Sequence, residues 1–78
     1  MFSRKKSSLL DSPEYRKARK RVEGIGTYSL LSWADTTGTD IAWCLNEYRK
    51  SNNSADLDQA DTGVAVLAAI IDELETRH

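Results

Sequence analysis

Two segments of the chain carry apolar residues at alternating spacings of three and four. This spacing places the members of each set on one side of an α-helix, because a helix turns once every 3.6 residues. The first set consists of Leu31, Ala34, Gly38, Ile41, Leu45 and Tyr48, and the second of Leu57, Ala60, Val64, Leu67, Ile71 and Leu74.

The segment between the two sets, residues 51–54, reads SNNS. Short polar side chains favour turns and helix caps. A loop of this length makes two neighbouring helices antiparallel, so the two apolar stripes are expected to face each other in a helical hairpin. Each helix is expected to span about 20 residues, or roughly 30 Å.

Gly38, in the sequence TTGT, raises the alternative of a helix-turn-helix, with a DNA-reading helix that starts at Asp40. However, the apolar register continues across Gly38. A three-helix core would also need aliphatic side chains at the positions of Thr37, Thr39, Cys44 and Glu47. We therefore predict one continuous helix, in which close approach of the second helix explains a glycine that costs about 1 kcal/mol relative to alanine.

A shorter helix is predicted before the hairpin, where residues 11–24 read DSPEYRKARKRVEG. Asp11 or Ser12 can cap it, Pro13 suits its first position, and the GIG at 24–26 ends it. Its apolar face is thin, so it must pack against another element. The expected fold is all-α, with a short basic N-terminal helix plus a long antiparallel helical hairpin. This single helical domain spans residues 11–78 and follows a disordered basic tail, residues 1–10.

The last helix is apolar on nearly every side, because residues 64–71 read VAVLAAII. A helix of this kind is usually buried on every side, and one hairpin leaves its outer side uncovered. Either the first helix folds over that side, or a second copy or another protein covers it. The candidate protein-interface residues are Trp33, Trp43, Val66 and Ile70.

Charge is distributed unevenly along the chain. Residues 1–21 hold eight of the eleven Lys and Arg and two carboxylates, whereas residues 22–78 hold three Lys and Arg and ten carboxylates. The basic part indicates either a polyanion contact or a solvated terminus. The candidate polyanion-binding residues are Arg4, Lys5, Lys6, Arg16, Lys17, Arg19, Lys20 and Arg21.

Nucleic acid is the obvious polyanion, but it is not the favoured partner. Nothing in the sequence reads bases, so such binding would be non-specific. Nucleic-acid surfaces also interleave cations with stacking rings, and both tryptophans lie outside the basic segment. A membrane-surface helix is weaker still, because residues 13–23 offer too little apolar face.

The search for catalytic or metal-binding groups finds no site. The only histidine is His78, and the single cysteine, Cys44, excludes an internal disulfide and a cysteine-built metal site. Asp56, Asp58 and Asp61 cluster where the last helix begins, and acidic side chains there favour the positive end of the helix dipole. We expect no enzyme activity, no cofactor and no small-molecule ligand. A lone cysteine and the lack of about 18 consecutive apolar residues fit a cytoplasmic protein.

Three stretches, YSLLSWAD at 28–35, EYRKS at 47–51 and AVLAAIIDELETR at 65–77, resemble small uncharacterised helical proteins of actinobacteria and their phages. The resemblance covers roughly residues 28–77 and consists largely of core spacing. It implies helix throughout residues 28–50 and no activity.

The function expected from these features is that of a non-enzymatic protein-interaction module, which self-associates through the second apolar face of its hairpin. The alternative is non-specific nucleic-acid binding through the basic arm and the first helix.

Overall fold

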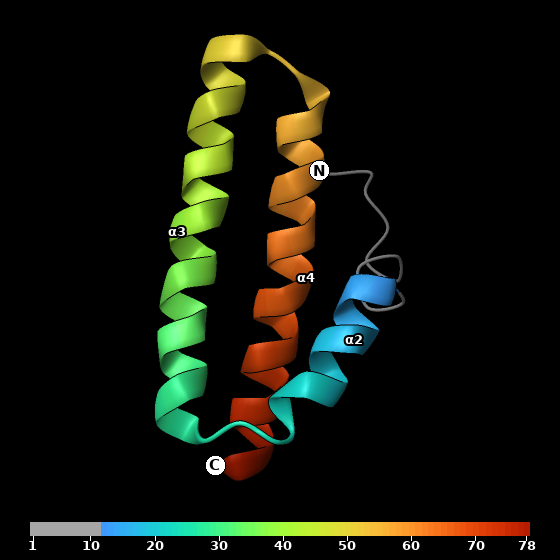
Figure 1. The fold of residues 1–78 in the computed structure, drawn as a ribbon, viewed down its shortest axis with the longest axis vertical. Coiled ribbons are helices and arrows are strands. Elements are labelled where there is room, and N and C mark those ends of the chain that lie inside the picture. The colour runs from blue at the N-terminus through green and yellow to red at the C-terminus, as the bar shows by residue number, and fades with distance from the viewer. Residues whose placement is uncertain (1–11) are drawn as a thin grey trace.

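The computed structural model describes residues 12–78, which form three helices and no strand. Helix α2 spans Pro13–Val22, α3 spans Thr27–Ser51 and α4 spans Ser54–Arg77. The long helices α3 and α4 lie antiparallel, and α2 packs against the half of α4 that ends at the C-terminus (Figure 1). The predicted all-α fold with a helical hairpin is confirmed. The tail predicted for residues 1–10 lies outside the described residues.

The start of α2 follows the capping chemistry that the sequence predicts. Ser12 has an extended backbone, and its hydroxyl accepts a hydrogen bond from the backbone N–H of Tyr15 at 3.1 Å. This bond satisfies one of the N–H groups that have no partner within the helix. Pro13 occupies the first helical position. The helix then ends at Val22, directly before the predicted break at 24–26.

The turn between α3 and α4 is made by two asparagines. Asn52 adopts a left-handed conformation with φ 59°, and its N–H donates to the carbonyl of Tyr48 at 2.7 Å. Asn53 caps α4, because its side-chain oxygen accepts from the N–H of Ala55 at 3.0 Å. Asparagine tolerates the left-handed region better than most residues. The predicted break at 51–54 is therefore confirmed.

Helix α3 continues without interruption through TTGT, so the single-helix prediction is confirmed. One of its supporting arguments is nevertheless wrong. Thr37 and Cys44 do lie in the core, because each is only 7% exposed. They are buried because they are small enough to fit where α3 and α4 approach each other closely.

The observed seam between α3 and α4 is rotated around each helix relative to the predicted one. Leu30, Thr37 and Cys44 are buried on α3, whereas Leu31 and Leu45 of the predicted stripe are about half exposed. These buried residues each precede a stripe position by one residue, which is about 100° around a helix. On α4, Ala60 of the predicted stripe is buried. However, three other members of that stripe, Leu57, Val64 and Ile71, stay partly exposed.

The rotation follows from the position of α2. Val22 of α2, Leu30 of α3 and Ile70 of α4 are completely buried against one another where the three helices meet. Ile70 therefore belongs to the core, and the expectation that it lies on an outer face is wrong. Val66 also packs against this cluster. Helix α2 thus covers the side of α4 that faces away from α3. This was one of the two alternatives offered by the sequence.

A buried carboxylate beside this core joins the ends of all three helices. Glu73 of α4 accepts hydrogen bonds from Arg19 of α2 at 3.3 Å and from Arg77 at 2.9 Å. Arg77 also donates to the carbonyl of Val22 and to the hydroxyl of Thr27, each at 3.1 Å. Because Glu73 is only 8% exposed, the two arginines compensate a charge that would be costly to leave alone.

The close approach of the hairpin helices occurs at Gly63, not at Gly38. A Cβ atom at Gly63 would lie 2.6 Å from Cγ1 of Ile41, whereas a Cβ at Gly38 would meet nothing within 4 Å. Gly38 lies beside open space because the observed seam is rotated away from it. The explanation of Gly38 as a contact point is therefore wrong.

The two helical glycines provide a matched pair of substitutions. Gly38→Ala should raise the free energy of unfolding by about 0.5–1 kcal/mol, because alanine favours helix and contacts nothing new. Gly63→Ala should be less stable than Gly38→Ala by about 1–3 kcal/mol, because Ile41 must move. Urea unfolding followed by circular dichroism measures both. Equal effects of the two substitutions would contradict the packing at Gly63.

The contribution of Glu73 can be measured in the same way. Glu73→Ala should lower the free energy of unfolding by about 2–4 kcal/mol, because it leaves two partly buried arginines without their carboxylate. The matched control is Glu47→Ala, which removes the exposed Glu47–Lys50 pair and should cost no more than about 0.5 kcal/mol. A Glu73 effect as small as that of Glu47 would contradict the stabilising role of the Glu73 ion pairs.

Candidate functional site

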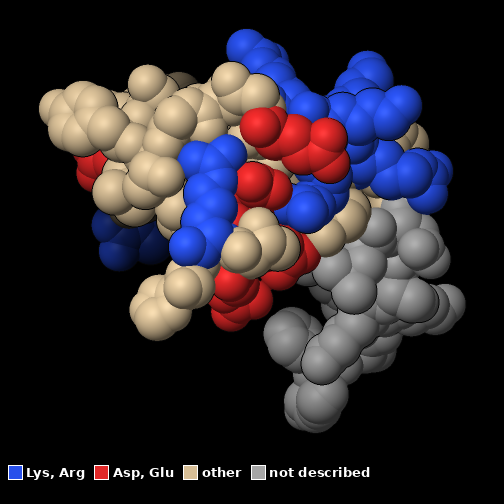
Figure 2. All heavy atoms as spheres, turned by 90° about the horizontal axis from the view of Figure 1, so that it is seen from below, with Lys and Arg blue, Asp and Glu red and all other residues tan. Residues whose placement is uncertain are grey.

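The outer face of α2 carries four exposed cations, Arg16, Lys17, Lys20 and Arg21. None of the ion pairs between described residues involves any of them. Figure 2, which views the end of the molecule where α2 joins α3, shows Lys and Arg side chains gathered on the side where α2 lies, beside a smaller group of Asp and Glu. We define these four residues as the basic face.

The other sequence candidates for polyanion binding do not join the basic face. Arg19 points inward, where it donates to the carbonyl of Ala69 and to Glu73, each at 3.3 Å. It is therefore a structural residue that positions α2 on α4. Arg4, Lys5 and Lys6 lie outside the described residues.

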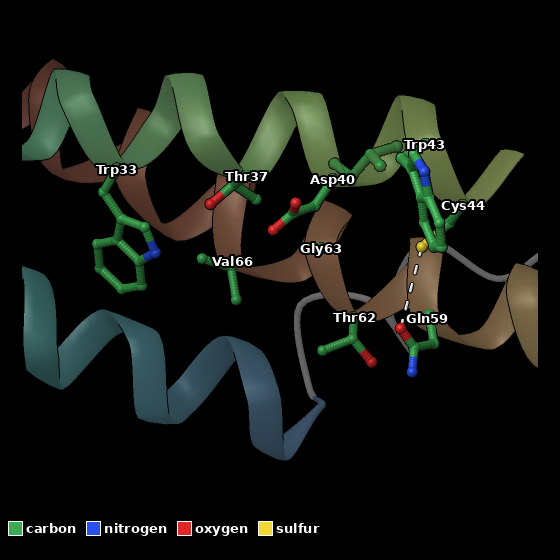
Figure 3. Close-up of a pocket in the computed structure, with 10 residues that line it drawn as sticks. Trp33, Thr37, Asp40, Trp43, Cys44, Gln59, Thr62, Gly63 and Val66 are labelled. Atoms are coloured by element: carbon green, nitrogen blue, oxygen red, sulfur yellow. Dashed lines mark hydrogen bonds between the residues drawn. The ribbon is translucent and has the colours of Figure 1, made fainter. Parts of the chain in front are cut away.

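A tryptophan from α3 lies against the basic face. The guanidinium carbon of Arg21 is 5.2 Å from the centroid of the Trp33 ring, within the range of a cation–π interaction. Figure 3 shows the indole of Trp33 pointing from α3 toward α2. A small open cavity of about 180 Å³ adjoins it, lined by Lys17, Arg21, Trp33 and Val66 among others. The separation of tryptophan from the basic segment along the sequence is thus not a separation in space.

Tyr15 fixes the first turn of α2 to α4. Its hydroxyl donates a hydrogen bond of 2.5 Å to the carboxylate of Asp72. This bond, followed by partial burial, raises the pKa of Tyr15 above its ordinary value of about 10, because ionisation would place a phenolate beside the carboxylate. Together with Arg19, this contact determines which side of α2 faces away from α4.

A wider groove of about 440 Å³ runs between α3 and α4 on the side of Trp33, lined by α3 from Trp33 to Cys44 and by α4 from Gln59 to Val66 (Figure 3). Among the described residues that line it, Asp40 and Cys44 are the ionisable ones. The thiol of Cys44 is buried and lies 3.9 Å from the side-chain oxygen of Gln59. A nucleophilic thiol needs a neighbouring base, and the groove supplies no histidine.

The residues described form no group of three or more His, Cys, Asp or Glu that could hold a metal ion. His78 lies at the end of α4, where a shallow hollow is lined by Ile71, Leu74 and Glu75. The residues of this hollow do not combine an acid, a base and a nucleophile. We find no arrangement in residues 12–78 that could be assigned to a catalytic step.

Three of the four sequence candidates for a protein interface, Trp33, Trp43 and Val66, line the groove between α3 and α4, whereas the fourth, Ile70, does not. Ile70 is fully buried, and Trp33 and Val66 are half-buried beside α2. Trp43 lies near the other end of the groove and is 62% exposed.

Sequence reasoning missed a different apolar surface. Leu31 and Leu45 on α3 stay 52% and 47% exposed, and Leu57, Val64 and Ile71 on α4 stay between 38% and 48% exposed. We call these five residues the hairpin face. Their spacing, seven residues on α4 and fourteen on α3, belongs to the sequence pattern, but that pattern assigns them to the seam.

No helix among residues 12–78 is both long enough and apolar enough to cross a membrane. Comparison of the chain with models of known families found no match, and searches of curated proteins and of solved structures found none either. The resemblance to actinobacterial and phage proteins therefore stays a prediction.

The role of Tyr15 in holding α2 has a pH signature. Tyr15→Phe should lower the free energy of unfolding by about 0.5–1.5 kcal/mol at neutral pH, because one partly exposed hydrogen bond is lost. In the native protein this contribution is fully present below pH 10. It is lost as pH rises from 10 through the raised pKa of the folded state, because the unfolded chain then binds fewer protons than the folded one. Urea unfolding of both proteins from pH 7 to 11 should show the difference shrinking, and a constant difference would contradict the assignment.

Proposed function

We propose that this protein is a non-enzymatic protein-interaction module that self-associates through its hairpin face. The single observation that carries the proposal is the partial exposure of five large aliphatic side chains, between 38% and 52%, in one row on each long helix. Members of a row are seven residues apart on α4 and fourteen residues apart on α3. Soluble monomers rarely expose a contiguous apolar surface of this kind without a partner.

Helix geometry supports placing both rows on one side of the hairpin. In each helix the exposed row follows a buried position by one residue, as Leu45 follows Cys44 and Ile71 follows Ile70. This step rotates the side chain by about 100°. Because α3 and α4 are antiparallel, the same rotation carries both rows to the same face. That face is opposite the one on which Trp33 and Val66 meet α2.

The size of this face favours a second copy as the partner. A hairpin of two helices about 36 Å long and about 10 Å wide offers roughly 700 Å² on one side. A standard stable interface buries about 800 Å² on each partner. Two hairpins related by a two-fold axis would pair apolar row with apolar row and complete a four-helix bundle.

The hairpin face differs from the interaction surface expected from the sequence. Ile70 is fully buried against Val22 and Leu30, so a partner that used it would have to displace a helix. The hairpin face requires no such rearrangement. The absence of an enzymatic role and a cytoplasmic location remain part of the proposal, the latter supported by the free thiol of Cys44.

Sedimentation equilibrium between about 1 µM and 1 mM should detect a dimer. The double variant Leu45→Glu and Val64→Glu should weaken dimerisation at least tenfold, because a two-fold interface places both charges in its apolar centre twice. Circular dichroism should show the helix content retained, since both side chains are partly exposed in the monomer.

The matched control is Trp43→Glu, which removes a large exposed side chain outside the hairpin face. It should leave the dimerisation constant unchanged. A monomer throughout the concentration range would contradict the proposal, as would a dimer that Trp43→Glu disrupts and the double variant does not.

A further inference from the structure

We infer that the basic face of α2 is a binding site for the phosphate backbone of nucleic acid. Its four cations form two columns on one helix, Arg16 with Lys20 and Lys17 with Arg21, each pair one turn apart. All four are exposed. Cations arranged in such columns can neutralise successive phosphates without reading bases. The inference is independent of the hairpin face.

The inward contacts of α2 explain why these cations point outward. Arg19 is held by Glu73, and Ala18 and Val22 are buried against α4. Tyr15 is held by Asp72. The helix therefore cannot turn about its axis without breaking an ion pair, a hydrogen bond and the core. The basic face is a fixed surface of the fold.

The charge of the remaining described residues restricts a polyanion to this face. Helix α2 carries five Lys and Arg against Glu14, a net charge of +4. Residues 23–78 carry three Lys and Arg against ten Asp and Glu, a net charge of −7. A polyanion is repelled by this part of the surface and attracted to α2, so electrostatics also orients its approach.

Trp33 places an aromatic ring against the cations of the basic face. Its ring lies under the guanidinium of Arg21 and lines the same small cavity as Lys17. The indole also limits the orientations of the Arg21 side chain, which lowers the entropy cost of a phosphate contact.

The composition of the basic face favours nucleic acid over the other anionic partners. A membrane-surface helix inserts apolar side chains into the lipid, but those of α2 are buried against α4. An interface with an acidic protein has an apolar centre, and the outward side of α2 offers none between its cations. A charged backbone needs only the cations and their spacing.

The test uses the full chain with Trp43→Phe, so that Trp33 is the only tryptophan. Titration with a fluorescently labelled DNA duplex of about 20 base pairs should raise the anisotropy of the label and change the emission of Trp33 as Arg21 meets phosphate. The logarithm of the affinity should fall linearly with the logarithm of salt concentration, with a contribution of about 0.9 for each phosphate contacted.

Arg16→Ala with Lys20→Ala should reduce that slope by about 1.8, because two phosphate contacts are lost. The matched control, Arg49→Ala with Lys50→Ala, removes the same charge at the far end of α3 and should change the slope little. In a third variant, Arg4, Lys5 and Lys6 are replaced by alanine. It measures how much these N-terminal cations contribute to the slope, apart from the basic face.

Three results would overturn the inference. The first is no binding at low salt, and the second is an equal loss of slope in the Arg16/Lys20 variant and in the Arg49/Lys50 control. The third is a slope that depends on the arm variant alone. Binding to vesicles of anionic phospholipid that is tighter than binding to the duplex, with the same dependence on Arg16 and Lys20, would instead assign the face to a lipid surface.

Discussion

The fold depends on one junction, at which Ile70 of α4 is covered on one side by Leu30 of α3 and on another by Val22 of α2. These three side chains are the largest that are fully buried. Glu73 lies one turn further along α4 and draws Arg19 and Arg77 over the same end of the molecule. A domain of 78 residues has little core to distribute, and here it is concentrated where all three helices meet.

This junction determines which surfaces remain for other molecules. Helix α4 is central, because both α2 and α3 pack against it. Its small residues Ala65 and Ala69 are buried, which leaves room for a neighbouring helix. Since α2 has only ten residues, it covers one face of the hairpin near one end. The opposite face, with Leu57, Val64 and Ile71, receives no cover from the described part of the chain.

The same junction also sorts the charges of α2. Arg19 is compensated by the carboxylate of Glu73, whereas no ion pair between residues 12–78 involves the four cations of the basic face. The molecule thus presents an apolar surface on one side of the hairpin and a cationic surface beyond the other side. Because different elements supply them, the two surfaces can act independently.

The sequence by itself determined the features that depend on neighbouring residues. Ser12 and Pro13 start α2, and Asn52 and Asn53 join the hairpin helices, because caps and turns are made by side chains and backbone groups a few positions apart. The continuity of α3 through Gly38 follows from its apolar period. The presence and order of the helices were therefore predictable from local chemistry and spacing.

Only the tertiary structure decided which side of each long helix is buried. Two adjacent rows on α3, one through Leu30 and one through Leu31, fit the same helical period, and a rotation of one residue exchanges them. The choice is made by α2, which contacts Ile70 although about fifty residues of sequence separate the two. The proximity of Arg21 to Trp33, and of Gly63 to Ile41, arises in the same way. Periodicity describes a single helix, whereas the buried side depends on all of the helices that pack against it.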